Sequence, residues 1–125
     1  MTPTARTLKH LRDQGYVAQV VEKWNAFSRT RLDLFGVIDV VACGNGEIIG
    51  VQATSGSNVG ARVKKALAEP RLKTWLESGG RFAVQGWAKQ GPRGKRKTWT
   101  PIWREITHED LRGAASGAAE ADSAV

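Results

Sequence analysis

The residue best suited to chemistry is Asp39, a carboxylate inside an apolar run rich in β-branched residues. A buried carboxylate is costly unless it is paired or binds a metal ion. Residues 44–46 (GNG) are typical of a hairpin turn, because Gly and Asn tolerate positive φ. The second strand of such a hairpin would bring Gln52 and Thr54 close to Asp39. Segment 33–55 is therefore predicted to hold the functional site.

The side chains around Asp39 suggest a metal site. Oxygen ligands from a carboxylate, a side-chain amide such as Gln52 and a backbone carbonyl suit Mg²⁺ or Mn²⁺, which are hard cations. Glu22, near the end of the preceding predicted strand, could supply a second carboxylate. Such a metal would polarise a phosphate and activate a water for phosphodiester hydrolysis. A structural alternative stays open, in which Asp39 caps a loop or pairs with Arg31 or Lys23.

A second acid, Asp33, lies near the start of the same strand. We favour a structural interpretation for it, as a cap or as the partner of Arg29 or Arg31 in a salt bridge. It is therefore not included in the predicted site.

Composition bounds the class of protein. The chain has 125 residues, 41% of them hydrophobic, which predicts one packed domain. Nineteen Lys and Arg against twelve Asp and Glu give a net charge of +7, which favours nucleic acid as a partner, although a merely soluble basic protein also fits. The single cysteine, Cys43, excludes an intramolecular disulfide and is interpreted as a small buried thiol. No apolar run approaches ~18 residues and no signal-peptide core is visible, so we expect a cytoplasmic protein without a membrane partner.

Cations gather in two places that could contact DNA. One is a predicted helix that begins near residue 59, and the other is the polar loop 90–97, which Trp87 and Trp99 flank. Positive groups near aromatic side chains suit a DNA backbone and an unstacked base. The structural alternatives are a solvated helix face and a solvated turn. The predicted DNA-binding residues are Arg62, Lys64, Lys65, Arg93, Lys95, Arg96 and Lys97.

The periodicity of the chain predicts an α/β fold with a central mixed sheet of about five strands flanked by helices. We expect one domain over residues 1–111 and a disordered tail at 112–125, and we expect Trp75 and Trp103 to pack in the core. The expected elements are a helix at 4–14, a strand at 16–24, a polar connection at 25–32, two strands within 33–55, a helix from 59 broken at 68–70 and continuing to about 77, and strands at 81–89 and 98–107.

A helix and a strand that carry an acid, then G-V-I-D at 36–39, Q-x-T at 52–54 and a basic helix, resemble the PD-(D/E)XK nuclease superfamily. The chain is most similar to its archaeal Holliday-junction-resolvase-like and small phage-encoded members. Asp39 matches the motif aspartate, and Glu22 is similar in position to an upstream acid of the family. Gln52 matches the motif glutamate, Ala53 supplies the intervening carbonyl and Thr54 matches the motif lysine.

The resemblance implies a restriction-endonuclease-like fold and a homodimer. It also implies an endonuclease dependent on Mg²⁺ or Mn²⁺, with branched DNA among its candidate substrates. Gln52 and Thr54 depart from the motif, because one removes a negative charge from the metal site and the other removes a cation. Lys64, Lys65 or Arg62 of the following helix could supply that cation. The alternative is a degenerate member that binds DNA without cutting it.

Overall fold

The predicted hairpin is formed by strands β4 (Val40–Gly44) and β5 (Glu47–Ser55), which pair antiparallel with Val40 opposite Val51. Asn45 and Gly46 form its turn with φ values of 54° and 77°, as the Asn-Gly pair favours. Asp39 lies immediately before β4, at the point where the chain enters the sheet. The predicted hairpin is therefore confirmed.

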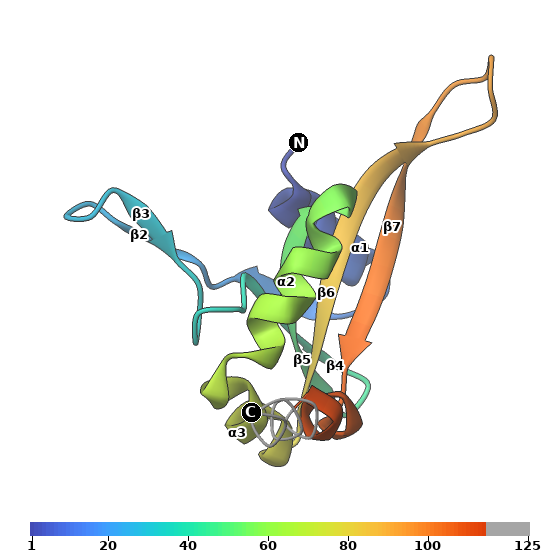
Figure 1. Cartoon of the computed structure of the whole chain (residues 1–125). Coiled ribbons are helices and arrows are strands. Elements are labelled where there is room, and N and C mark those ends of the chain that lie inside the picture. Colours follow the sequence, from blue (N-terminus) through green and yellow to red (C-terminus); the bar gives the residue numbers. More distant parts are fainter. Residues whose placement is uncertain (115–125) are drawn as a thin grey trace, which may run out of the picture.

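The computed structural model describes residues 1–114, and its main feature is a mixed sheet in the order β1-β4-β5-β6-β7 (Figure 1). Strands β5 and β6 are parallel, and the other neighbours are antiparallel. The predicted α/β class, with a five-stranded mixed sheet flanked by helices, is confirmed. The remaining elements are α1 (Pro3–Asp13), β1 (Val17–Val20), β2 (Lys23–Asn25), β3 (Thr30–Leu32), the 3₁₀ turn η1 (Gly56–Asn58), α2 (Val59–Leu67), α3 (Pro70–Glu77), β6 (Gly80–Gln90) and β7 (Thr98–Ile106).

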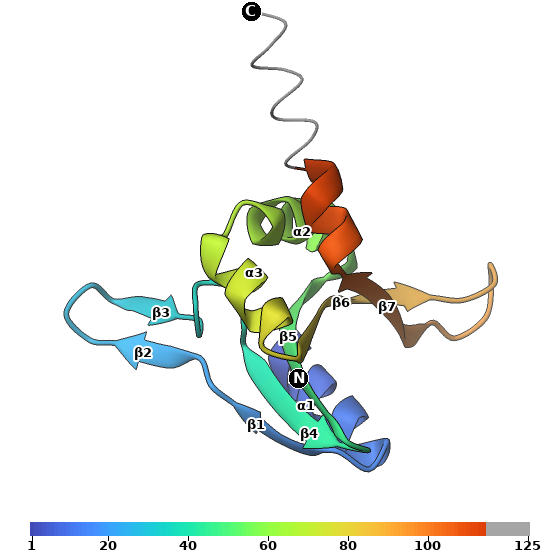
Figure 2. The same cartoon turned by 90° about the horizontal axis from the view of Figure 1, so that it is seen from below.

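Helices cover both faces of the sheet (Figure 2). Helix α1 packs through Leu11 against Ala42 and Val51 on one face. Helices α2 and α3 pack on the other face, where Leu72 of α3 joins the cluster that contains Phe82. Successive residues of a strand point to opposite faces, so each strand contributes alternate side chains to these two cores.

The prediction of one strand at 16–24 and a polar connection at 25–32 was wrong. The strand ends at Val20, and the chain then forms a second, two-stranded sheet from β2 and β3, which projects from the body (Figure 1). The Asn25 side-chain oxygen accepts hydrogen bonds from the backbone N–H groups of Phe27 and Ser28, at 2.9 and 3.3 Å. This Asx turn reverses the chain where only a polar run was visible in the sequence.

The remaining boundaries follow the sequence closely. The predicted break at 68–70 separates α2 from α3, and Pro101 lies on the edge strand β7, where a missing N–H is tolerated. Residues 108–114 are helical, which includes the first three residues of the predicted tail, and residues 115–125 lie outside the described residues. None of the helices in residues 1–114 has the length and apolar composition needed to cross a membrane.

Candidate metal centre

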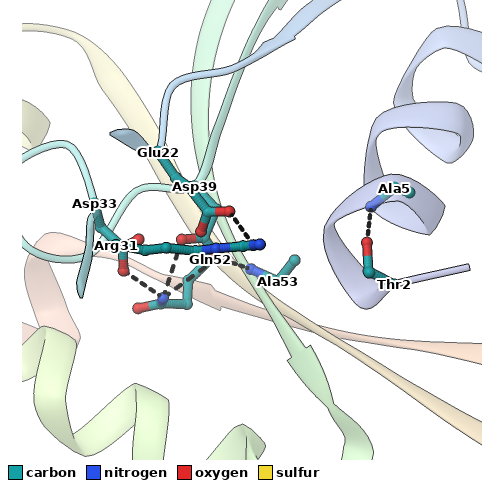
Figure 3. Close-up of polar contacts among 8 residues, drawn as sticks. All are labelled: Thr2, Ala5, Glu22, Arg31, Asp33, Asp39, Gln52 and Ala53. Carbon is teal, nitrogen blue, oxygen red and sulfur yellow. Dashed lines mark hydrogen bonds and ion pairs between the residues drawn. The ribbon is translucent and has the colours of Figure 1, made fainter. Parts of the chain in front are cut away.

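Three carboxylates meet where the two sheets join. One oxygen atom of each of Glu22, Asp33 and Asp39 lies within 4.8 Å of the others (Figure 3). Glu22 comes from the link between β1 and β2, Asp33 follows β3, and Asp39 precedes β4. The β2–β3 hairpin therefore brings the two acids that flank it to the start of β4, where Asp39 lies.

Asp39 is the most buried member of this acid cluster, with 4% of its surface exposed. The Ala53 backbone N–H donates to its Oδ2 at 2.8 Å, and its own N–H donates to the Val51 carbonyl at 2.9 Å. Burial, followed by a side-chain hydrogen bond with Asp33 and by the nearby negative charges, raises the pKa of Asp39 to about 8. Its carboxyl group therefore keeps a proton at neutral pH unless a cation compensates the charge.

Gln52 lies across the hairpin from Asp39 and is 3% exposed. Its Nε2 donates to Asp33 Oδ2 at 3.0 Å and to Asp39 Oδ2 at 3.3 Å (Figure 3). Its Oε1 is buried and has no hydrogen-bond partner within the described residues. Rotation of the amide by half a turn would direct this oxygen at the carboxylates. Three carboxylates and one amide oxygen form a donor set that fits Mg²⁺ or Mn²⁺.

The structure brings together most of the predicted site. Asp39, Gln52, Ala53 and Glu22 meet in one place, as their contacts show. Thr54, 5% exposed, follows two residues after Gln52 and so faces the same side of β5. The pairing of Asp39 with Arg31 that the structural alternative allowed is not observed, because Arg31 pairs with Glu22, at 2.8 Å.

Asp33 is the member of the acid cluster that sequence reasoning assigned to a structural role. The chain between Asp33 and Asp39 folds back on itself through a bridge between Leu34 and Ile38. Phe35 and Gly36 make this turn with positive φ values of 53° and 77°. The Phe-Gly pair was the one sequence signal of this turn, and it does not by itself reveal which side chains the turn brings together.

A cleft of about 550 Å³ opens beside the acid cluster. Asp33 lines it together with the cations of Arg31, Lys65 and Arg71. Of the predicted DNA-binding residues, Lys65 is the one that lines this cleft. Arg62 and Lys64 lie elsewhere on α2, and the loop between β6 and β7 projects beyond the body of the molecule (Figure 1). The exposed cations of that loop are Arg93, Lys95, Arg96 and Lys97.

The tryptophans differ from the sequence expectations. Trp87 is 8% exposed, and its indole N–H donates to the Thr7 hydroxyl at 3.0 Å, so it packs in the core. Trp103 was expected in the core but is 41% exposed on the edge strand. Trp75 packs against the core as expected. The expected buried thiol of Cys43 is exposed, because its side chain faces away from α1 on the outer part of β4.

Comparisons with protein-family models, with curated proteins and with solved structures find no match to this chain. The function must therefore be inferred from the geometry of the site.

Proposed function

We propose that this chain is a metal-dependent DNA endonuclease, similar to the PD-(D/E)XK nucleases in the layout of its site. The observation that carries the proposal is the convergence of Glu22, Asp33 and Asp39 within 4.8 Å beside a cleft lined by cations. The charges of Asp33 and Glu22 help to raise the pKa of Asp39 and disfavour its ionisation, and a divalent cation would remove that penalty. A strong affinity for such a cation is the simplest reason to place them together.

Each residue of the site has a role in this proposal. Glu22, Asp33 and Asp39 would hold Mg²⁺ or Mn²⁺, with the Gln52 amide oxygen and the Ala53 carbonyl as further ligands. The bound ion would polarise the scissile phosphate and lower the pKa of a water molecule. The Thr54 hydroxyl would orient a water.

The cleft supplies the positive charge that the site lacks at Thr54. Lys65 lines the same cleft as Asp33, and so do Arg31 and Arg71, which pair with Glu22 and Glu69. Guanidinium and ammonium groups bind phosphate oxygens through charge-assisted hydrogen bonds, so this cleft would hold the DNA backbone next to the acid cluster. The preference for branched DNA, the homodimer and the contact of the β6–β7 loop with DNA stay predictions.

The test is incubation of supercoiled plasmid and of a four-way DNA junction with Mg²⁺ or Mn²⁺. The wild-type chain should nick at least one of them, and Asp39→Asn, which keeps the shape of the side chain, should lose about a hundredfold or more in rate. Asp13→Asn is the matched control, because Asp13 is an exposed acid on α1. Equal cutting by Asp39→Asn would overturn the assignment of the site.

A second candidate is a DNA-binding protein that does not cut. It is favoured by the Gln52 amide, which donates to Asp33 and Asp39 and so satisfies them without a metal. In that case the wild-type chain binds DNA at low salt and nicks neither substrate. The double variant Gln52→Glu with Thr54→Lys should then gain nicking. Absence of both binding and nicking would exclude both candidates.

A further inference from the structure

A cavity of about 330 Å³ lies between α1 and β7, on the face of the sheet opposite α2 and α3. We call it the α1–β7 cavity, and the residues that matter to its chemistry are His10, Gln14, Tyr16, Gln85, Pro101 and Trp103. Val84 packs in the core under α2 and α3, so the next residue of β6, Gln85, points to the α1 face. Gln52 pairs with Val84 and faces the other way, which separates this cavity from the acid cluster by the thickness of the sheet.

Gln85 is the unusual member of the cavity wall. It is 1% exposed, and neither its Nε2 nor its Oε1 has a hydrogen-bond partner within the described residues. Burial of an amide without partners costs free energy, which a Leu of similar size would avoid. Both atoms are buried in this conformation, so Gln85, which lines the cavity, would turn its amide toward it in order to pair with a ligand that offers one donor and one acceptor side by side.

The rings around Gln85 indicate the shape of that ligand. Trp103 lies directly opposite Gln85 on the edge strand β7 and is 41% exposed. Tyr16 and the His10 imidazole add two further flat groups to the wall. Aromatic walls with one amide on the floor suit a flat heteroaromatic ring, and a glutamine amide pairs with adjacent donor and acceptor atoms of a nucleobase such as adenine.

Two cations from neighbouring elements lie beside the same face of β7. The Arg6 guanidinium lies 3.8 Å from the centre of a Trp99 ring, and the Lys89 ammonium lies 5.4 Å from it. Trp99, Pro101 and Trp103 alternate along the strand and therefore share this face. Stacking rings beside cations are typical of surfaces that hold a single nucleic-acid strand.

We propose that the α1–β7 cavity binds an unstacked nucleobase, with both atoms of the Gln85 amide paired to the edge of the base and its ring against Trp103. Arg6 and Lys89 contact the phosphates of the same strand. The proposal does not depend on cleavage at the acid cluster.

The test is binding of a fluorescent oligo-dA strand, measured by anisotropy, with the strand labelled at one end. Gln85→Leu should weaken binding at least about fivefold, the lower end of what one recognised base contributes. It should leave the melting temperature equal or higher, because it removes an unpaired buried amide. Trp103→Ala changes an exposed side chain and should also weaken binding. The matched control is Trp24→Ala, on the β2–β3 hairpin, with Trp24 57% exposed and binding expected within about twofold.

Competition distinguishes the two possible sources of the base, a free nucleoside and a nucleic-acid strand. Displacement of the strand by adenosine would show that the base alone suffices, and displacement only by unlabelled oligo-dA would show that the strand is needed. Unchanged binding by Gln85→Leu and Trp103→Ala would overturn the proposal, as would a marked loss of stability in Gln85→Leu. Binding of the strand is measured with a chelator present, so a failure of the nuclease assignment leaves this result intact.

Discussion

Two groups of charged side chains lie between the strands of this protein, and they differ in whether the carboxylates have a cation as their partner. At one end, Arg81 of β6 donates hydrogen bonds to Glu47 and to Glu105, so each of these carboxylates faces a cation. In the acid cluster, Asp33 and Asp39 face each other and accept hydrogen bonds from the neutral N–H groups of Gln52 and Ala53. Arg31 and Glu22 form an ion pair there, which does not include Asp39.

The pKa values follow this difference. Hydrogen bonds from Arg81 lower the pKa of Glu105, whereas burial and the Asp33 carboxyl group raise the pKa of Asp39 to about 8. Charges that serve the fold are compensated within the chain. Charges that are left without compensation in a buried place are typical of functional sites, where a ligand supplies the opposite charge.

The largest expected effect concerns the pH dependence of stability in a metal-free buffer. The pKa of Asp39 is 3.8 in the unfolded chain and about 8 in the folded one, so the folded state binds more protons between these values. The free energy of unfolding should therefore fall as pH rises through this window, by up to about 6 kcal/mol in total. Urea unfolding at several pH values, with a chelator present, measures this fall.

Asp39→Asn is the variant that isolates this contribution. An amide does not ionise, so the variant should lose most of the fall between pH 4 and 8 and should be more stable than wild type at pH 8. A wild-type chain whose stability stays level across this window would contradict the uncompensated state of the acid cluster.

The second effect is stabilisation by metal. At pH 8, Mn²⁺ at about a hundred times its Kd should raise the free energy of unfolding of wild type by about 2–3 kcal/mol. Gln52→Glu adds a carboxylate and should tighten binding by about tenfold, because affinity rises with the charge of the ligands. Calorimetric titration and thermal unfolding measure the two quantities. Equal stabilisation of Asp39→Asn would show that the ion binds elsewhere.

The third effect concerns the compensated group. Arg81→Met removes the cation and leaves Glu47 and Glu105 close together, and we expect a loss of about 1–2 kcal/mol at pH 7. The loss should shrink as the pH falls below the pKa of a free glutamate, because the lowered pKa of Glu105 stabilises the fold only while the carboxylate is ionised. Urea unfolding at neutral and acidic pH tests this. An undiminished loss in acid would mean that Arg81 acts through packing.

The sequence predicts the sheet well because its strongest signals are local. The Asn45-Gly46 turn, the break before Pro70 and the alternation along β6 each depend on residues that are neighbours in the chain. These signals predict that Gln52 lies close to Asp39. The register of a hairpin with a two-residue turn leaves little freedom, so this half of the site was predictable.

The other half of the site depends on contacts between distant segments. Glu22 and Asp33 reach Asp39 only because Asn25 turns the chain into the β2–β3 hairpin. A polar run with several cations gave no periodic signal for strands as short as three residues. The same reason explains Trp103, whose exposure is decided by where α1 ends on the sheet and not by its own strand.

The smallest expected effect tests whether a short distance or burial decides the strength of a contact between charged side chains. Lys9 Nζ and Asp13 Oδ2 are 2.6 Å apart, closer than most contacts in the acid cluster, yet their side chains are 65% and 62% exposed. Water screens such a pair, so Lys9→Ala should change the free energy of unfolding by less than about 0.5 kcal/mol, with no response to Mn²⁺. Thermal unfolding with and without the metal measures both. A change as large as that of Arg81→Met would mean that short distance alone decides the strength of these contacts. The contrast between the acid cluster and the Arg81 group would then lose its physical basis.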